Sequence, residues 1–271
     1  MLAHIKSYLI DRFFIKKPWL RKRVTRWLYG TANVRVRLFG ADLTVNAARE
    51  NGYLRAFRKA AYSSVFRDEV SGFLALAYVL REGDCFVDVG ANIGLYSSVV
   101  ARLPGVKVVA LEANPDTYRR LEENALTHHF QAVHIAVSDQ PGELEFVEGA
   151  VSHVFAVSEH RTVYNTSETV KVRSARLDEI LSVEEGPFIL KIDVEDHEPQ
   201  VLAGASGLLE VGRIHAVLLD VSQKSAEAAS QLRSKGFRVL DADTFSEPTA
   251  ATAVFLAIHP SRCPTPLLKQ P

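Results

Sequence analysis

The sequence predicts an α/β fold with a doubly wound sheet, because strand and helix patterns alternate between residues 84 and 241. Two further observations support this fold class. The first predicted core strand runs into a glycine turn, FVDVGANIG at residues 86–94, and the second core strand ends in an acid, Glu112. A strand, a glycine turn, a helix and a second strand ending in an acid form the first half of a nucleotide-binding βαβ unit.

The individual elements follow from the periodicity of apolar residues. Alternation around Gly40 predicts a β-hairpin over residues 34–45, and helical patterns follow at about 50–61 and 67–81. The sheet and its helices are then expected in this order: strand 84–89, helix 94–103, strand 106–112, helix 116–127, strand 131–137, a small hairpin at 143–147 and 169–173 with an irregular stretch between, strand 187–193, helix 198–209, strand 213–220, helix 222–235 and strand 237–241. The last strand, 253–258, has no helix before it, so we expect it antiparallel at or near the sheet edge.

The chain has 271 residues, 47% of them hydrophobic, which is enough for one large domain with an appendage. We expect four parts. They are a basic amphipathic helical segment over 1–30, a hairpin and helices covering the site over 31–83, the main α/β domain over 84–260 and a proline-rich, extended tail over 261–271.

The net charge of zero hides an uneven distribution. Residues 1–30 hold eight lysines and arginines against one acid, together with both tryptophans, Trp19 and Trp27. Such a segment suits contact with a membrane surface or a polyanion. It equally suits a helical appendage that packs on the domain and keeps its basic face in solvent, and the sequence leaves both alternatives open.

Cysteine content and hydropathy limit the cellular compartments in which we expect the protein. Cys85 and Cys263 cannot build a disulfide framework, and Cys85 enters a core strand, where a buried thiol is expected. We therefore predict a reducing, cytoplasmic compartment, with residues 1–30 as a candidate contact to the inner face of a membrane. No Cys/His group has zinc spacing, so no metal is expected. No apolar run is long enough to cross a bilayer, and the N-terminus lacks a cleavage pattern.

The residues of the glycine turn distinguish between two nucleotide ligands. A dinucleotide needs bare backbone beside its pyrophosphate, but Asn92 and Leu95 stand where its motif has the second and third glycines. Asp88, two residues before the turn, would also repel a pyrophosphate. S-adenosylmethionine instead brings an ammonium and a sulfonium to the turn, and Glu112 can accept from the ribose hydroxyls of either ligand. The turn therefore favours S-adenosylmethionine.

A second group of ionisable residues ends the fourth predicted core strand, where residues 188–198 read FILKIDVEDHE. In a doubly wound sheet the ligand crevice lies at the carboxyl ends of the strands beside the switch point. This group is therefore aimed at the substrate. Capping of the next helix accounts for one or two of the acids. It does not account for Asp193 on the strand or for Lys191 within an apolar run.

These paired motifs resemble those of the FkbM family of S-adenosylmethionine-dependent methyltransferases. The family joins a D-V-G-A-N-I-G turn to a later K-I-D-V-E-G-x-E and a V-L-x-G-A run, which match residues 88–94, 191–198 and 201–205. Shorter matching features are AVSD at 136–139, RLD at 176–178, and Glu69 ahead of Gly83. The resemblance covers about residues 65–258 and departs from the family at Asp196, which stands where the family has glycine.

The resemblance implies a class I methyltransferase (Rossmann-like) fold, methyl transfer to an oxygen, and no cofactor besides S-adenosylmethionine. Asp88 is then expected to hold the amino group of the donor, directly or through water. Gly90 and Gly94 should let the donor approach the backbone. Asn92 should bond the donor carboxylate or brace the turn.

The other end of the donor has its own expected partners. Glu112 should bind the ribose diol, and Ser138 or Asp139 should accept a hydrogen bond from the adenine amino group. Asn114 is expected first of all to cap the helix that follows Glu112.

An alcohol acceptor needs a base, because a protonated hydroxyl is a poor nucleophile. Asp193, Glu195 and His197 are the candidates. His197 is favoured because histidine suits neutral pH, with Glu195 orienting the acceptor or the imidazole. His153 and His160 fall in an irregular stretch that is a weaker candidate to cover the acceptor.

The expected acceptor is a hydroxyl on a small molecule, a glycan or a glycolipid. Two alternatives stay open. A nucleic-acid methyltransferase is motivated by the basic N-terminus, but the acidic balance of the remaining chain weighs against a bound phosphate backbone. The other alternative is a binding protein that keeps the fold but catalyses no reaction. Asp196 in place of the family glycine would be the first evidence for it, and the intact donor motif is evidence against it.

Overall fold

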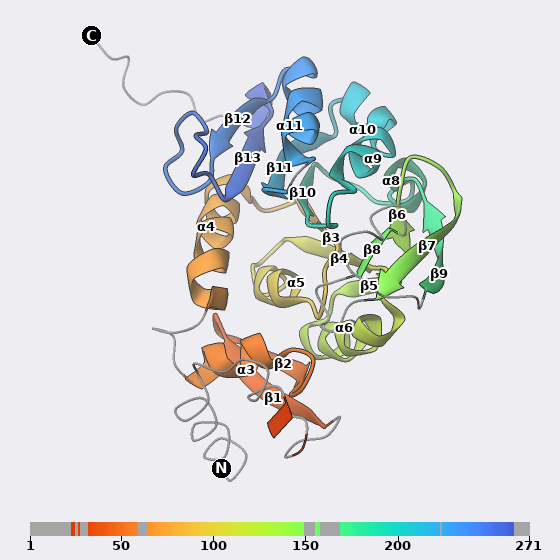
Figure 1. The fold of residues 1–271 in the computed structure, drawn as a ribbon. Coiled ribbons are helices and arrows are strands. Elements are labelled where there is room, and N and C mark those ends of the chain that lie inside the picture. Colours follow the sequence, from red (N-terminus) through yellow and green to blue (C-terminus); the bar gives the residue numbers. More distant parts are fainter. Residues whose placement is uncertain are drawn as a thin grey trace.

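The computed structural model describes residues 23, 24, 27, 32–58, 64–148, 155–157, 169–222 and 224–262 (Figure 1). Several predictions from the sequence lie outside these residues. They concern most of the basic segment 1–30, the histidines His153 and His160, and the tail from Cys263 onward.

The described elements follow the predicted order closely. They are β1 (Asn33–Leu38), β2 (Ala41–Asn46), α3 (Asn51–Arg58), α4 (Ser64–Val79), β3 (Cys85–Val89), α5 (Leu95–Val100), β4 (Lys107–Glu112), α6 (Pro115–His128), β5 (Gln131–His134), β6 (Ala136–Val137), β7 (Gly142–Glu148), β8 (Phe155–Val157), β9 (Thr169–Ala175), α8 (Leu177–Ile180), β10 (Phe188–Ile192), α9 (Glu198–Ala203), α10 (Ser206–Glu210), β11 (Ile214–Asp220), α11 (Ser225–Ser234), β12 (Arg238–Asp241), β13 (Val254–Ile258) and the single 3₁₀ turn η3 (Pro260–Arg262).

The main sheet has seven strands in the order β12-β13-β11-β10-β3-β4-β5. All run parallel except β13, which is antiparallel to both of its neighbours. The prediction for the last strand is thereby confirmed, because β13 lies antiparallel beside the edge strand β12. The strands β3 and β10 are buried along their whole length, as expected of central parallel strands covered on both faces.

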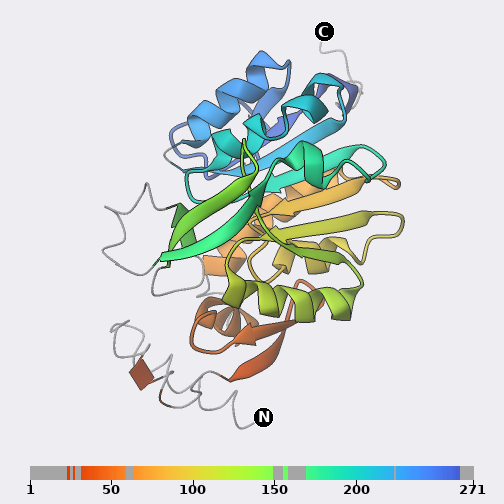
Figure 2. The same cartoon turned by 90° about the vertical axis from the view of Figure 1, so that its right-hand side faces the viewer.

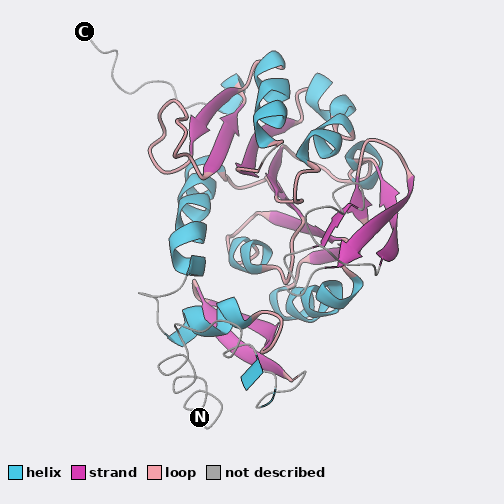
Figure 3. Cartoon of the chain, viewed as in Figure 1, coloured by secondary structure: helices cyan, strands magenta, loops and turns pink. Residues whose placement is uncertain are grey.

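Each face of the sheet packs against its own set of helices (Figure 3). Side chains of α4 and α5 share one apolar core with β3, β11 and β13, and α6 packs beside them on β4. The helices α9, α10 and α11 cover the opposite face. Cys85 lies in this second core as a buried free thiol, as predicted, and burial raises its pKa to about 11.

The predicted strand 131–137 is wrong in its extent. The strand β5 leaves the main sheet after His134, and Ala136–Val137 form β6, which pairs in parallel with β9. The branch lies at Ile135, whose N–H donates to the Glu112 carbonyl at 3.1 Å. The predicted hairpin is confirmed as β7 and β9, and the small sheet has the order β6-β9-β7-β8. Its strands β7 and β9 cross in front of the main sheet in Figure 2.

The predicted helix 198–209 is two helices, α9 and α10, separated at Gly204 and Ala205. The Gly204 carbonyl accepts from the Asp178 N–H at 3.0 Å, so it does not continue the helical ladder. A Cβ at Gly204 would lie 2.1 Å from the Ser138 carbonyl oxygen. This close approach requires glycine and ties α9 to the end of β6.

The predicted tail also begins differently, because residues 260–262 form the 3₁₀ turn and pack on the domain. Arg262 is buried, donates through Nε to the Val79 carbonyl at 2.9 Å, and forms an ion pair with Asp84. The extended conformation expected of the tail therefore does not hold for its first described residues.

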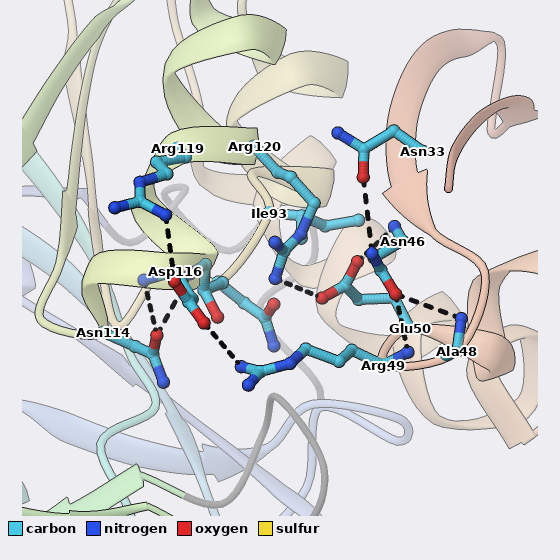
Figure 4. A network of polar contacts seen from close by, with 12 residues as sticks. Asn33, Asn46, Ala48, Arg49, Glu50, Ile93, Asn114, Asp116, Arg119 and Arg120 are labelled. Carbon is cyan, nitrogen blue, oxygen red and sulfur yellow. Dashed lines mark hydrogen bonds and ion pairs between the residues drawn. The ribbon is translucent and has the colours of Figure 1, made fainter. Parts of the chain in front are cut away.

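The N-terminal hairpin β1–β2 and α3 pack below α5 and α6. Their link is polar as well as apolar (Figure 4). Glu50, before α3, forms a buried ion pair with Arg120 of α6 at 2.5 Å. The Asn124 side chain accepts from the Thr44 N–H at 2.7 Å and donates to the Ile93 carbonyl at 2.8 Å. The hairpin is thus fastened both to α6 and to the glycine turn.

Within the described ranges, no helix combines the length and the apolar character needed to span a bilayer. The predicted membrane contact of residues 1–30 stays a prediction.

Replacing Arg120 with Ala should leave the Glu50 carboxylate buried without its cation, which costs on the order of 3–5 kcal/mol. Urea unfolding measures this change in the free energy of unfolding. The matched control is Arg119→Ala on the same helix, because the Arg119 side chain is 76% exposed and its ion pair with Asp116 should contribute about 0–1 kcal/mol. Equal effects of the two substitutions would contradict the structural role of the Glu50–Arg120 pair.

Candidate active site

A cavity opens at the carboxyl ends of the central strands, with about 670 Å³ of empty space that includes the open solvent at its mouth. Its lining comes from the ends of β3, β4, β6 and β10 and from the small sheet. The lining residues are Val89, Gly90, Asn92, Leu111, Glu112, Ala113, Ile135, Ala136, Val137, Phe146, Asp193, Val194, Glu195 and His197. This is the place where a doubly wound sheet binds its ligand. No residue from 32–58 or 64–83 is among them, although that region was expected to cover the site.

The glycine turn has the backbone geometry that its sequence predicts. Gly90 has φ 76° and Gly94 has φ 83°, a region that favours glycine. A Cβ at Gly90 would also lie 2.0 Å from the Asp193 carbonyl oxygen, so only glycine lets β3 and β10 approach this closely. Asn92 has φ 53°, a conformation that asparagine tolerates, and it lines the cavity.

Glu112 holds the two loops that flank the cavity. Its Oε2 accepts from the Asn92 N–H at 2.8 Å and its Oε1 accepts from the Asn114 N–H at 2.7 Å. Asn114 in turn caps α6, as predicted, because its side chain accepts from the N–H groups of Asp116 and Thr117. Burial raises the pKa of Glu112 to about 7, against the lowering effect of the two backbone hydrogen bonds. Each carboxylate oxygen keeps a second lone pair for a ribose hydroxyl.

Asp88 lies one layer below the cavity and does not line it. Its side chain is fully buried, and its Oδ2 accepts from the Ser97 hydroxyl at 2.7 Å. Its Oδ1 accepts no hydrogen bond and lies 4.0 Å from the Lys191 Nζ. Burial raises the pKa of this carboxyl, and the Lys191 ammonium opposes the shift. The expected contact of Asp88 with the donor amino group stays a prediction.

Apolar side chains form one end of the cavity, at β6 and the small sheet. Ile135, Val137 and Phe146 lie there, and Val194 adds an apolar side chain from the loop after β10. These flat and branched side chains suit an adenine ring. Gly94, Ser138 and Asp139 are not lining residues, although they were predicted at the donor site.

The structure brings together two predicted residues that are 59 positions apart. The Ser138 hydroxyl lies 3.0 Å from the His197 Nε2 and 3.0 Å from the Asp139 Oδ1. The hydroxyl has a single proton, so when it donates to Asp139 it must accept from His197. The His197 ring is therefore held at the apolar end of the cavity, beside the end of β6.

Asp193 lies at the opposite side of the cavity, toward β3 and β11. Its side chain is 41% exposed, and its Oδ2 accepts from the Lys191 Nζ at 3.1 Å. Lys191 is buried and lies 5.0 Å from the Tyr96 ring centroid. Burial lowers the pKa of Lys191, but the carboxylates of Asp193 and Asp88 outweigh this effect and raise it. Lys191 is thus a permanent cation beside Asp193.

The backbone explains why the family has glycine at position 196. Glu195 and Asp196 have φ values of 50° and 71°, so the loop passes through the left-handed region twice. Aspartate tolerates this conformation better than most residues. The Asp196 Oδ1 also accepts from the Lys224 N–H at 3.1 Å, a contact that glycine could not make. Asp196 therefore keeps the turn and does not line the cavity.

The predictions from the sequence did not include Asp220, which ends β11 beside β10. Burial and the carboxylate of Asp193 raise the pKa of Asp220 to about 7, against the lowering effect of Lys191. The available signal was the run VLLD at 217–220, an apolar strand that ends on an acid as β4 does. Among the described residues, no group of three or more His, Cys, Asp or Glu is placed to hold a metal ion.

The strand order, the antiparallel β13 and the cavity beside the glycine turn define a class I, S-adenosylmethionine-dependent methyltransferase. The model of the methyltransferase FkbM domain matches residues 88–239, which is more than half of the chain, and this protein belongs to that family.

Two relatives are similar in sequence. The hexuronic acid methyltransferase AglP of Haloferax volcanii is 29% identical over 207 residues, which cover 70% of this chain and 83% of the relative. The 31-O-demethyl-FK506 methyltransferase FkbM of Streptomyces tacrolimicus is 29% identical over 215 residues, which cover 66% of this chain and 81% of the relative. Solved structures are more distant. An Aeropyrum pernix fibrillarin has a TM-score of 0.41 at 15% identity, over 85% of this chain and 83% of its own.

Donor affinity should rise with pH through about 7, because a ribose diol donates best to the ionised Glu112 and protonation removes an acceptor. Glu112→Gln should lower the affinity roughly 10- to 150-fold at pH 8 and flatten this pH dependence, since the amide can accept only one of the two backbone hydrogen bonds. Calorimetry with S-adenosylhomocysteine between pH 6 and 8 measures both effects. Glu122→Gln, on the exposed side of α6, is the matched control. A variant that keeps the wild-type affinity and pH slope would show that Glu112 does not bind the donor.

Proposed function

We propose that this methyltransferase transfers the methyl group of S-adenosylmethionine to a hydroxyl oxygen of a small molecule, a glycan or a glycolipid. The observation that carries the proposal is the cavity in which Glu112 and the glycine turn face Asp193. The cavity thus combines a binding place for the donor with a carboxylate, that of Asp193. The relatives support a glycan or small-molecule acceptor, since their names specify a hexuronic acid and the 31-O position of FK506.

Three groups of residues bind three parts of the donor. Glu112 binds the ribose, and Gly90 and Asn92 bind the methionine part. The apolar side chains at β6 and the small sheet enclose the adenine, with Ser138 and Asp139 just beyond them as the predicted polar partners of its amino group. The donor is already activated, so the protein mainly supplies alignment and a dry pocket.

The predicted base candidates lie at different ends of this donor. His197, which the sequence favours, rests on Ser138 at the adenine end. Asp193 lies at the other side, where β10 meets β3 and β11. This arrangement supports Asp193 as the candidate that faces the acceptor, with Glu195 on the loop between the two ends.

The test uses donor labelled in its methyl group, which is incubated with the protein and a fractionated extract, followed by identification of the labelled product. We expect label in a small molecule or glycan that survives both ribonuclease and mild alkali. Mild alkali releases methanol from a methyl ester and leaves a methyl ether intact. Alkali-labile label would indicate a carboxylate acceptor, and ribonuclease-sensitive label would indicate a nucleic acid. Either result would overturn the proposed hydroxyl acceptor.

We also propose that residues 1–30 add affinity for an anionic membrane surface, on the basis of their charge and their tryptophans. A chain lacking residues 1–30 should keep its thermal transition and lose sedimentation with phosphatidylserine vesicles. The full chain should stop sedimenting with the vesicles at high salt. Equal sedimentation of the two chains would contradict the proposal, and a truncated chain that fails to fold would assign the segment to the core instead.

A further inference from the structure

Beside the side of the cavity away from adenine lies an acidic cluster, of which Asp193 alone is a lining residue. We define the acceptor cluster as Asp193, Asp220 and Asp88 around the Lys191 ammonium. Three strands supply these residues to one face of the sheet. In the register of the sheet, Lys191 lies beside Asp88 on one neighbouring strand and beside Leu218 on the other.

The register also places Asp193 opposite Asp220. The last paired residues of β10 and β11 are Ile192 and Leu219, so the next residues along the two parallel strands are Asp193 and Asp220. Neighbouring strands lie about 4.8 Å apart, and side chains in register share a face of the sheet. The two carboxylates therefore lie side by side at the edge where the ligand binds.

The acceptor cluster has more carboxyl groups than groups that can donate to them. Lys191 is one cation against three carboxylates, and it hydrogen-bonds Asp193. The fully buried Asp88 Oδ1, which faces the same ammonium, accepts no hydrogen bond. Within the described residues, no side chain donates to the Asp220 carboxylate. Asp220 is partly exposed and follows β11 in register with the lining residue Asp193, so its carboxylate is one to which a ligand can supply the missing donor.

The direction of the bound donor points to the same place. The proposed function puts adenine at β6, the ribose at the end of β4 and the methionine part at the end of β3, and in the strand order this line continues toward β10 and β11. Gly90 and Asp193 touch where β3 meets β10, next to the methionine part. An acceptor that attacks the sulfonium methyl therefore has the acceptor cluster beside it.

We propose that the acceptor hydroxyl binds at the acceptor cluster and that Asp220 takes its proton. This inference rests on the proposed function. The hydroxyl oxygen forms the new C–O bond to the methyl carbon, and the C–S bond breaks with its electron pair going to sulfur. The hydroxyl proton passes to the Asp220 carboxylate. The products are a methyl ether and neutral S-adenosylhomocysteine. The acidic surroundings favour an uncharged acceptor over a carboxylate.

The protonation state of Asp220 fits this role. Its pKa is raised to about 7 by burial and by Asp193, against the lowering effect of Lys191, while Glu69 on α4 and Glu198 on α9 add to the increase. A base whose pKa lies near neutral pH is effective at neutral pH.

Sinefungin tests the geometry without knowledge of the acceptor, because it carries an ammonium where the donor carries the transferred methyl group. We expect sinefungin to bind tighter than S-adenosylhomocysteine. Asp220→Asn should reduce this preference roughly tenfold or more while leaving S-adenosylhomocysteine affinity within about twofold. The preference should also grow as pH rises through about 7 in the wild type and stay flat in the variant. Asp243→Asn, on an exposed turn, is the matched control and should behave as the wild type.

Two outcomes would overturn the inference: an unchanged preference in Asp220→Asn, or an equal loss of affinity for both ligands. A wild-type chain that binds neither ligand would contradict the proposed function instead. In the labelled-transfer assay, Asp220→Asn should lose roughly 10²–10⁴ in rate at pH 8. Full rate with normal S-adenosylhomocysteine affinity would exclude Asp220 as the proton acceptor.

Discussion

The geometry of the donor site depends on one buried carboxylate, that of Glu112. It accepts a backbone N–H from the glycine turn and another from the loop that begins α6, so it fixes both loops relative to the end of β4. A backbone N–H buried without an acceptor costs about 1–3 kcal/mol, which makes each of these bonds a structural requirement. The glycine turn and the acid that follows it therefore form one unit. The acid shapes the turn before any ligand arrives.

The same edge of the sheet shows how the fold brings ionisable side chains together. The strands β3, β4, β10 and β11 each deliver a carboxylate at or near their carboxyl ends, and parallel strands bring these ends to one edge. Burial and neighbours then separate their roles. Glu112 is held by backbone donors, Asp88 and Asp193 lie within ion-pair distance of the Lys191 ammonium, and Asp220 forms no ion pair in the described structure. Four similar side chains thus acquire different environments.

The sequence predicted what depends on local periodicity and on motif spacing. The alternation of strands and helices, the hairpin, the cap at Asn114 and the antiparallel last strand all agree with the structure. The predictions are wrong where contacts between segments that are distant in the sequence determine the local structure. The strand after α6 divides because β9 offers a second partner, and the helix after β10 breaks because Asp178 takes the Gly204 carbonyl. The contact between Ser138 and His197 and the pairing of Asp193 with Asp220 required the three-dimensional register, which no local pattern contains.

Asn124 has a consequence for the modularity of the family. Its side chain joins the N-terminal strand β2 to the carbonyl of Ile93 in the glycine turn, although β2 lies outside the matched family domain. An N-terminal extension exchanged between relatives would therefore bring with it one support of the donor turn. Recombination at the domain boundary is constrained by this amide, and the extension and α6 can change only together.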